Sequence, residues 1–172
     1  MAEYEFTLKF KLPSADADVD ALVERLGEAG CNDALVGVGV QGRIALDFTR
    51  NASSALEALS SAIKDVRKAT PGAQLIEVGP DLVGLTDVAE MVSVTRQNMQ
   101  KLMTTHFDFP SPVYTGPIQL WHLGDLLSWL ERRSYQISGT ILEMASVAMQ
   151  CNVAMESEKV EPPKRLRKLV AC

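Results

Sequence analysis

The segment from residue 4 to residue 12 constrains the fold most, because polar and apolar side chains alternate along it without a break. Phe6, Leu8, Phe10 and Leu12 fall on one side of a β-strand, whose successive side chains point to opposite faces. Such a strand buries one face and leaves the other in solvent. The rest of the chain must therefore supply a layer that covers the apolar face.

The following residues predict the elements that could form this layer. Residues 16–29 begin with acidic side chains and continue with apolar residues at three- to four-residue spacing up to Gly30, which is typical of an amphipathic helix. Residues 34–40 and 43–48 predict a β-hairpin that turns at Gln41 and Gly42. Residues 53–69 predict a second helix and residues 73–78 a last strand. The order β-α-β-β-α-β is that of a ferredoxin-like domain, in which two helices cover one face of a four-stranded antiparallel sheet.

Charge is distributed unevenly along the 172 residues. The net charge of −5, taken over the whole surface, would repel nucleic acid. Residues 1–83, however, hold eight Lys and Arg against thirteen Asp and Glu, whereas residues 84–172 hold nine of each. The acidic surplus thus belongs to the first half, and the net charge does not exclude DNA binding by the second half.

Residues 84–103 contain two helix starts nine residues apart. Thr86 and Thr95 each precede a helix-forming run, and each hydroxyl can accept a hydrogen bond from an unpaired backbone N–H, so we expect both to cap helices. Helices so short and so closely joined can cross at a large angle, as in a helix-turn-helix. The expected shared core is Val88, Ala89, Val92, Val94, Met99 and Leu102.

The remaining side chains of the second of these helices, residues 95–104, suit a DNA groove. Arg96 can bond guanine edges, Gln97 and Asn98 can bond adenine edges, and Lys101 can neutralise phosphate. None of its polar side chains is acidic. An exposed helix needs polar residues in any case, so an ordinary solvated surface is the alternative interpretation.

Residues 109–123 predict a small β-ribbon turning at residues 115–117, and residues 124–133 predict a largely apolar helix. The stretch from residue 85 to residue 133 resembles the winged helix-turn-helix of the MerR superfamily, and within it the AlpA and excisionase-like phage regulators. The resemblance depends on Leu85-Thr86, Val88-Ala89, Thr95-Arg96, the Phe-Pro-x-Pro-Val pattern of residues 109–113, Trp121 and Trp129-Leu130.

This resemblance implies that the second helix enters the major groove while the wing touches the backbone or the minor groove. It gives an expected DNA-contacting set of Thr86, Thr95, Arg96, Gln97, Asn98, Lys101, Tyr114, Thr115, Arg132 and Arg133. The chain departs from the family at two places: Ser93 stands where the family often has Gly, and residues 114–119 carry no charge where family wings are commonly basic.

Enzymatic interpretations have less support. Residues 37–42 match GxGxxG, but a dinucleotide site needs this motif to open a helix, and here it precedes a predicted strand. His106 and His122 are in no recognisable catalytic pattern, and Cys31, Cys151 and Cys172 contain no CxxC pair. We therefore expect neither catalysis nor a cofactor nor a metal.

The C-terminal residues leave two questions open. Ile137, Ile141, Met144, Ala148, Cys151 and Met155 recur at spacings of four and three, as in a short coiled coil that either pairs two chains or packs back on its own module. The basic residues 164–168 are either simply solvated or available to DNA phosphates.

The sequence thus predicts an α+β protein with a ferredoxin-like domain (1–80), a winged helix-turn-helix (81–135), a C-terminal helix (136–160) and a basic tail (161–172). Its expected function is that of a prokaryotic or phage transcriptional regulator, a homodimer that reads an inverted repeat of double-stranded DNA. Because residues 1–5 show no secretory pattern and no segment suits a membrane, we expect it in the cytoplasm, at the nucleoid. The first domain would mediate oligomerisation, bind a protein partner or sense a small-molecule effector. An antitoxin-like or excision-directing protein and an adaptor that does not bind DNA are the alternatives.

Overall fold

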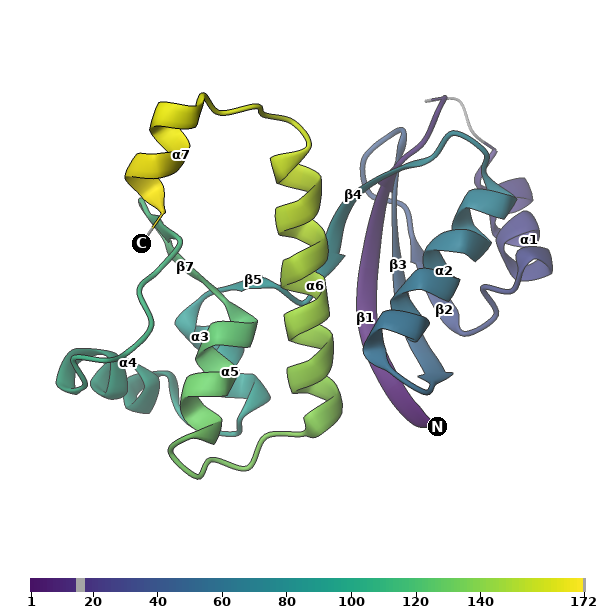
Figure 1. Ribbon diagram of the computed structural model, residues 1–172. Coiled ribbons are helices and arrows are strands. Elements are labelled where there is room, and N and C mark those ends of the chain that lie inside the picture. Colours follow the sequence, from purple (N-terminus) through teal and green to yellow (C-terminus); the bar gives the residue numbers. More distant parts are fainter. Residues whose placement is uncertain (15–17, 172) are drawn as a thin grey trace.

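The computed structural model describes residues 1–14 and 18–171 and has an α+β architecture (Figure 1). Its strands are β1 (Ala2–Lys11), β2 (Ala34–Gly37), β3 (Arg43–Ala52), β4 (Gln74–Gly79), β5 (Leu82–Val83), β6 (Tyr114–Thr115) and β7 (Gln119–His122). Its helices are α1 (Val19–Ala29), α2 (Ala55–Ala69), α3 (Leu85–Met91), α4 (Arg96–Thr105), α5 (Leu123–Glu131), α6 (Gly139–Ser157) and α7 (Lys164–Val170). Within the described residues, none of these helices could cross a membrane.

The first four strands form one sheet in the order β2-β3-β1-β4, and all neighbours in it are antiparallel. Leu8 of β1 pairs with Leu46 of β3 on one side and with Val78 of β4 on the other. The alternation that the sequence predicts is confirmed, since Phe6, Leu8, Phe10 and Leu12 are all buried. Helices α1 and α2 cover that face (Figure 1). We call residues 2–79 the N-terminal domain.

Local chemistry sets the ends of these helices. The side chain of Asp18 accepts hydrogen bonds from the backbone N–H groups of Asp20 and Ala21 and so begins α1; residue 16, also expected in this acidic start, lies outside the described residues. Gly30 ends α1 with a φ of 112°, a left-handed conformation that glycine adopts without strain. Ser54, within the stretch predicted as helix, caps α2.

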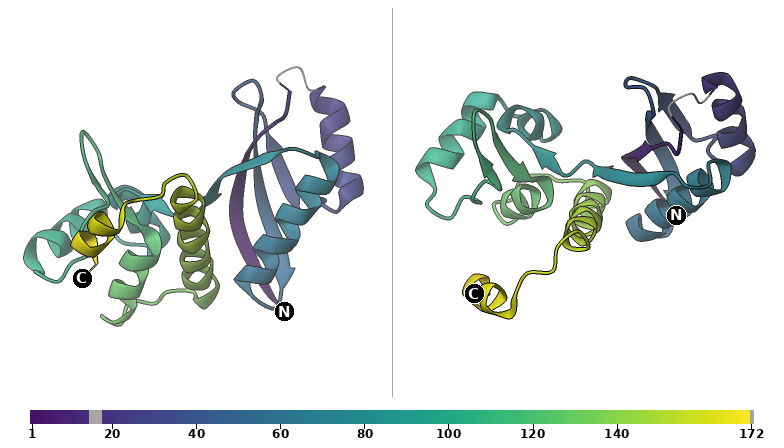
Figure 2. Two further views of the ribbon diagram at one scale, coloured as in Figure 1. Left: turned by 45° about the horizontal axis from the view of Figure 1, so that its top comes forward. Right: turned by 90° about the horizontal axis from the view of Figure 1, so that it is seen from above.

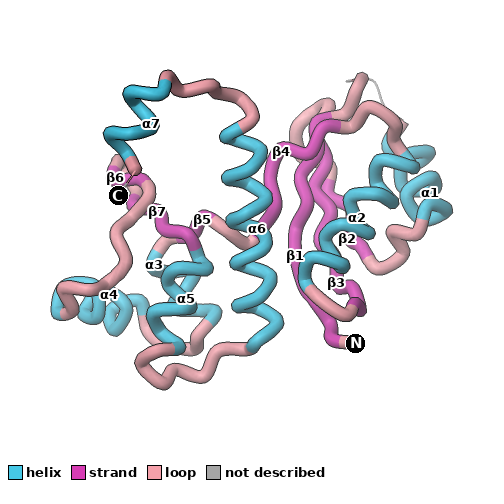
Figure 3. The backbone as a smooth tube through the Cα atoms, in the orientation of Figure 1, coloured by secondary structure: helices cyan, strands magenta, loops and turns pink. Residues whose placement is uncertain are grey.

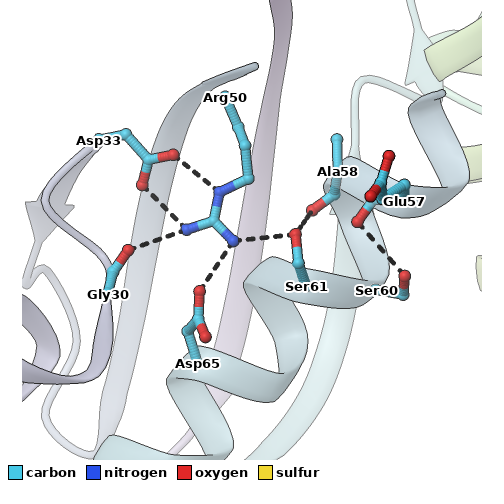
Figure 4. A network of polar contacts seen from close by, with 8 residues as sticks. All are labelled: Gly30, Asp33, Arg50, Glu57, Ala58, Ser60, Ser61 and Asp65. Carbon is cyan, nitrogen blue, oxygen red and sulfur yellow. Dashed lines mark hydrogen bonds and ion pairs between the residues drawn. The ribbon is translucent and has the colours of Figure 1, made fainter. Parts of the chain in front are cut away.

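A buried arginine, which the sequence analysis did not single out, connects α1, β3 and α2 (Figure 4). The guanidinium of Arg50 donates to both carboxylate oxygens of Asp33 at 2.7 and 2.9 Å and to Asp65 at 2.9 Å. Its other hydrogen bonds go to Ser61 and to the carbonyl of Gly30, so every nitrogen of the fork has a partner. Two carboxylates on one buried cation make this contact costly to break and fix α1 and α2 on the sheet.

Residues 82–131, from β5 to α5, form what we call the second module. Its sheet has the order β5-β7-β6, and β5 is a strand that the sequence analysis missed: Leu82 pairs with His122 and Val83 with Trp121. The expected core is confirmed, because Val88, Ala89 and Met99 are buried, and Val92, Val94 and Leu102 pack against the same cluster. Trp121 and Trp129 are the largest side chains of this core.

Helix α6 lies between the N-terminal domain and the second module and belongs to the cores of both (Figures 1 and 2). Met144 and Ala148 are buried in the core of the N-terminal domain, whereas Ala145 is buried in that of the second module. Cys151 and Met155 also pack on the N-terminal domain. Five of the six apolar residues that the sequence places on a possible dimer seam are thus engaged within the chain. Only Ile137 packs on the preceding module, as the second alternative expected; the other four pack on the N-terminal domain, which neither alternative foresaw.

Polar side chains of α6 reinforce this packing. Asn152 accepts a hydrogen bond from the backbone N–H of Val78 and donates to its carbonyl, at 2.9 and 2.8 Å, so it pairs with the free edge of β4. The same amide donates to the buried Asp81, whose other oxygen lies 2.6 Å from Nδ1 of His122. Near the other end of α6, Glu143 accepts from the hydroxyl of Tyr4 and from the first backbone N–H of α2, and the Tyr4 contact raises the pKa of that tyrosine.

Removal of the Asn152 amide should loosen this junction. We expect Asn152→Ala to lower the free energy of unfolding by about 2 kcal/mol, because it leaves an edge N–H, an edge carbonyl and one oxygen of the buried Asp81 carboxylate without a partner. Urea unfolding followed by circular dichroism measures the effect. Gln150→Ala, which removes an exposed amide of the same helix, is the matched control and should change stability by less than about 0.5 kcal/mol. Equal effects of the two substitutions would show that the Asn152 contacts do not stabilise the junction.

Candidate nucleic-acid interface

The segment from α3 to α4 has the geometry of two short helices joined by a tight turn. Ser93 lies in this turn with a φ of 56°, a left-handed conformation that glycine adopts more easily than serine. The backbone N–H of Val94 returns to the carbonyl of Ala89 at 2.9 Å and closes the turn. Thr95 caps α4 as expected, since its hydroxyl accepts from the backbone N–H of Asn98 at 3.1 Å.

Thr86 does not cap α3, which corrects the expectation. The helix begins two residues earlier than expected, with Gly84 at the cap position, and Thr86 is an exposed residue of its first turn. The carboxylate of Asp87 accepts a hydrogen bond from the backbone N–H of Gly84 at 2.8 Å, so Asp87 and not Thr86 stabilises the start of the helix. Thr is a common cap residue, but an acid three residues after the cap position stabilises the same helix start.

Helix α4 buries one side and exposes an acid-free polar face. Met99 is fully buried under it, and Asn98 is half-buried. Arg96, Gln97 and Lys101 are exposed, as expected for side chains that contact DNA. Their side chains have no hydrogen-bond or ion-pair partner among the described residues, so nothing within the described chain competes for them.

The loop between α4 and β6 (Figure 3) is fixed on the two tryptophans. The ring of Phe109 lies edge-on to both, with centroids 4.9 Å from Trp129 and 6.3 Å from Trp121. The indole N–H of Trp121 donates to the carbonyl of Pro110 at 2.9 Å. His106, at the end of α4, lies edge-on to Trp129. These contacts attach the end of α4 and the start of the wing to one rigid core.

Arg132 and Arg133, the two arginines expected to hold the DNA backbone, differ in availability. Arg133 donates to both carboxylate oxygens of Asp108 at 2.7 and 2.8 Å and lies 3.7 Å from the centre of the Trp129 ring. This ion pair lowers the pKa of Asp108. It also means that the Arg133 guanidinium already has a partner within the chain. Arg132 is exposed and has no such partner among the described residues.

The wing is formed by β6, β7 and the turn at residues 116–118. Tyr114 and Thr115 are exposed on it, and the ring of Tyr114 covers Gly116 so closely that a Cβ there would lie 2.1 Å from the phenol oxygen. A hollow opens between this turn and the starts of α3 and α4, and Thr86, Arg96, Gln100 and Gln119 are among the residues that line it.

The structure therefore divides the expected site residues into groups. Thr86 and Arg96 both line the hollow, whereas Gln97, Asn98 and Lys101 lie on α4 outside its lining. Gln100 and Gln119, which the expected DNA-contacting set omits, belong to it. The signal for Gln100 was present in the sequence, because it lies four residues after Arg96 and so shares a helix face with it.

The alternative sites gain no support from their surroundings. Residues 37–42 connect β2 to β3, so the GxGxxG match belongs to a hairpin and not to the start of a helix. His122 has a carboxylate partner in Asp81. Over the described residues, no three His, Cys, Asp or Glu side chains are arranged to hold a metal ion.

No family model matches the chain, and no curated protein and no solved structure is significantly similar to it.

The left-handed turn residue gives a direct test of the helix-turn-helix geometry. Ser93→Gly should raise the free energy of unfolding by about 1 kcal/mol, because glycine adopts the positive φ without strain. Ser93→Val should lower it by a similar amount or more, since a β-branched residue is poorly tolerated there. Thermal or urea unfolding measures both; a glycine variant that is less stable than the parent would mean that the turn is not left-handed.

Proposed function

We propose that the protein is a sequence-specific DNA-binding regulator that acts as a homodimer, with a ferredoxin-like N-terminal domain and a winged helix-turn-helix as its second module. Helix α4 would lie in the major groove of an inverted-repeat site. The strand order β2-β3-β1-β4 under two helices favours the first assignment, and the order α3, α4, β6, β7, α5 favours the second.

The observation that carries the proposal is the exposed face of α4. It presents two cations and several amides but no carboxylate, in a protein with a net charge of −5. Thr95 caps α4, and residues 95–97 at its start are exposed; the first turn of a recognition helix is the part that contacts base edges. In this proposal Arg96 and Gln97 contact bases, Thr95 contacts phosphate, and Lys101 and Arg132 hold the backbone.

A specific observation favours an adaptor function as the second candidate. Phe107 is fully exposed in the loop after α4, and Val113 and Ile118 near the wing are more than half exposed. Exposed apolar side chains on an uncharged wing and on the loop before it would suit a protein partner better than phosphates. An antitoxin-like or excision-directing protein would use both surfaces.

Selection of bound fragments from random DNA distinguishes the candidates. A specific regulator should enrich an inverted repeat, and its affinity for the enriched site should exceed that for unrelated DNA by about 10³-fold or more at fixed salt. Absence of any enriched motif, with affinity that falls equally for all sequences as salt rises, would refute specific recognition and leave the adaptor as the better account.

The role of Arg96 has a sharper test. Arg96→Ala should weaken binding to the selected site by about 1–3 kcal/mol and relax the preference at one base position. Arg96→Lys keeps the charge but not the bidentate fork, so it should relax the same position while leaving the salt dependence nearly unchanged. Fluorescence anisotropy with labelled duplexes measures both. Arg43→Ala, an exposed arginine of the N-terminal domain, is the control; a loss of affinity there equal to that of Arg96→Ala would show only a general charge effect.

A further inference from the structure

A cleft of about 540 Å³ lies between the open face of the N-terminal sheet and the start of α6. One wall carries Glu5 and Asp47 from β1 and β3, with two threonines beside them. The other wall is apolar and includes Met91 at the end of α3 and Ile141 at the start of α6.

The two walls are complementary to an occupant that has both basic and apolar side chains. Glu5 and Asp47 are exposed, Asp47 accepts a hydrogen bond from the hydroxyl of Thr7 at 2.6 Å, and no basic side chain lines the cleft. On the apolar wall, Met91 and Ile141 expose 42% and 38% of their surface. A cation with an apolar side would pair with the first wall and cover the second.

Helix α7 has this chemistry. It carries Lys164, Arg165, Arg167 and Lys168, and no acidic residue. Leu166, Leu169 and Val170 are exposed, and their spacing of three and four places them on one side of the helix. None of its residues belongs to either hydrophobic core.

We propose that α7 of one chain docks in the cleft of a second copy, with its leucines on Met91 and Ile141 and its basic residues near Glu5 and Asp47. Reciprocal docking of this kind closes a two-fold dimer by exchange of the tail.

The tether between α6 and α7 favours a second copy over the same chain. The cleft lies at the first turns of α6, and the tether leaves from its other end, about 24 Å away at 1.5 Å per residue from Ile141 to Ser157. The seven Cα–Cα steps from Ser157 to Lys164 reach at most about 25 Å, so a tail that returned to its own cleft would need an almost fully extended tether. In addition, α7 and the N-terminal sheet lie on opposite sides of α6 (Figures 1 and 2), so a tail that returned to its own cleft would have to pass around that helix.

Charge reversal in the full-length chain tests the docking. The cleft variant Glu5→Lys/Asp47→Lys and the tail variant Arg165→Glu/Arg167→Glu change exposed side chains only. Sedimentation equilibrium without DNA should show that the parent chain dimerises and that each variant alone has a dissociation constant raised by about tenfold or more. An equimolar mixture should regain the affinity of the parent, because both contacts in a mixed dimer join opposite charges. Glu24→Lys/Glu28→Lys replaces two exposed acids of α1 and is the control for the cleft variant, whose charge change it matches.

Three outcomes would overturn the proposal. A parent chain that remains monomeric excludes exchange between copies, and variants that do not regain association when mixed exclude the pairing of these two surfaces. A tail variant that keeps the parental mass but binds DNA more weakly shows that α7 contacts phosphates instead. Because mass is measured without DNA, failure here leaves the proposed DNA-binding function to its own test.

Discussion

Sharing of α6 between two hydrophobic cores is the constraint on which the arrangement of the molecule depends. Met144 and Ala145 are neighbours in the sequence, yet one is buried against the N-terminal domain and the other against the second module. A helix buried on two sides cannot move with one unit without opening a cavity in the other, and cavities in packed cores are costly. The recognition helix proposed for α4 is therefore held at a fixed position relative to the N-terminal sheet.

Polar contacts at both ends of α6 make this arrangement specific as well as stable. Apolar packing alone would let the helix slide or rotate by small steps, because burial of apolar area has little directionality. The Asn152 amide donates one hydrogen bond to Val78 at the β4 edge and accepts another from it. Glu143 accepts hydrogen bonds from the hydroxyl of Tyr4 and from the first backbone N–H of α2. Each of these contacts is satisfied at only one register of the helix. The same Asn152 amide covers part of a strand edge that would otherwise be open to pairing with another chain.

Local patterns in the sequence were sufficient for most of the elements. Alternation located β1, helical spacing located α1 and α2, and the pairing of Thr95 with a polar run located α4 within one residue. The features that sequence reasoning missed depend on distant partners. β5 has only two residues and exists because β7 lies beside it, and the network around Arg50 joins residues up to 20 positions apart. Assignment of Arg133 to DNA failed to foresee Asp108, which is 25 residues away and carries no sequence signal that links it to the arginine.

The contact between Arg133 and Asp108 also changes how the charge of the second module should be counted. A phosphate contact strengthens binding by releasing counterions only if its cation is free, and Arg133 already has a carboxylate and an aromatic ring as partners. In each copy, α4 and the end of α5 then offer Arg96, Lys101 and Arg132. Three cations beside an uncharged wing support only weak binding by one module, so tight binding in this proposal requires two modules on one duplex. The tail cannot serve both purposes at once: if α7 joins the two chains, its four basic residues are withdrawn from the DNA, and specificity must come from the base contacts of α4.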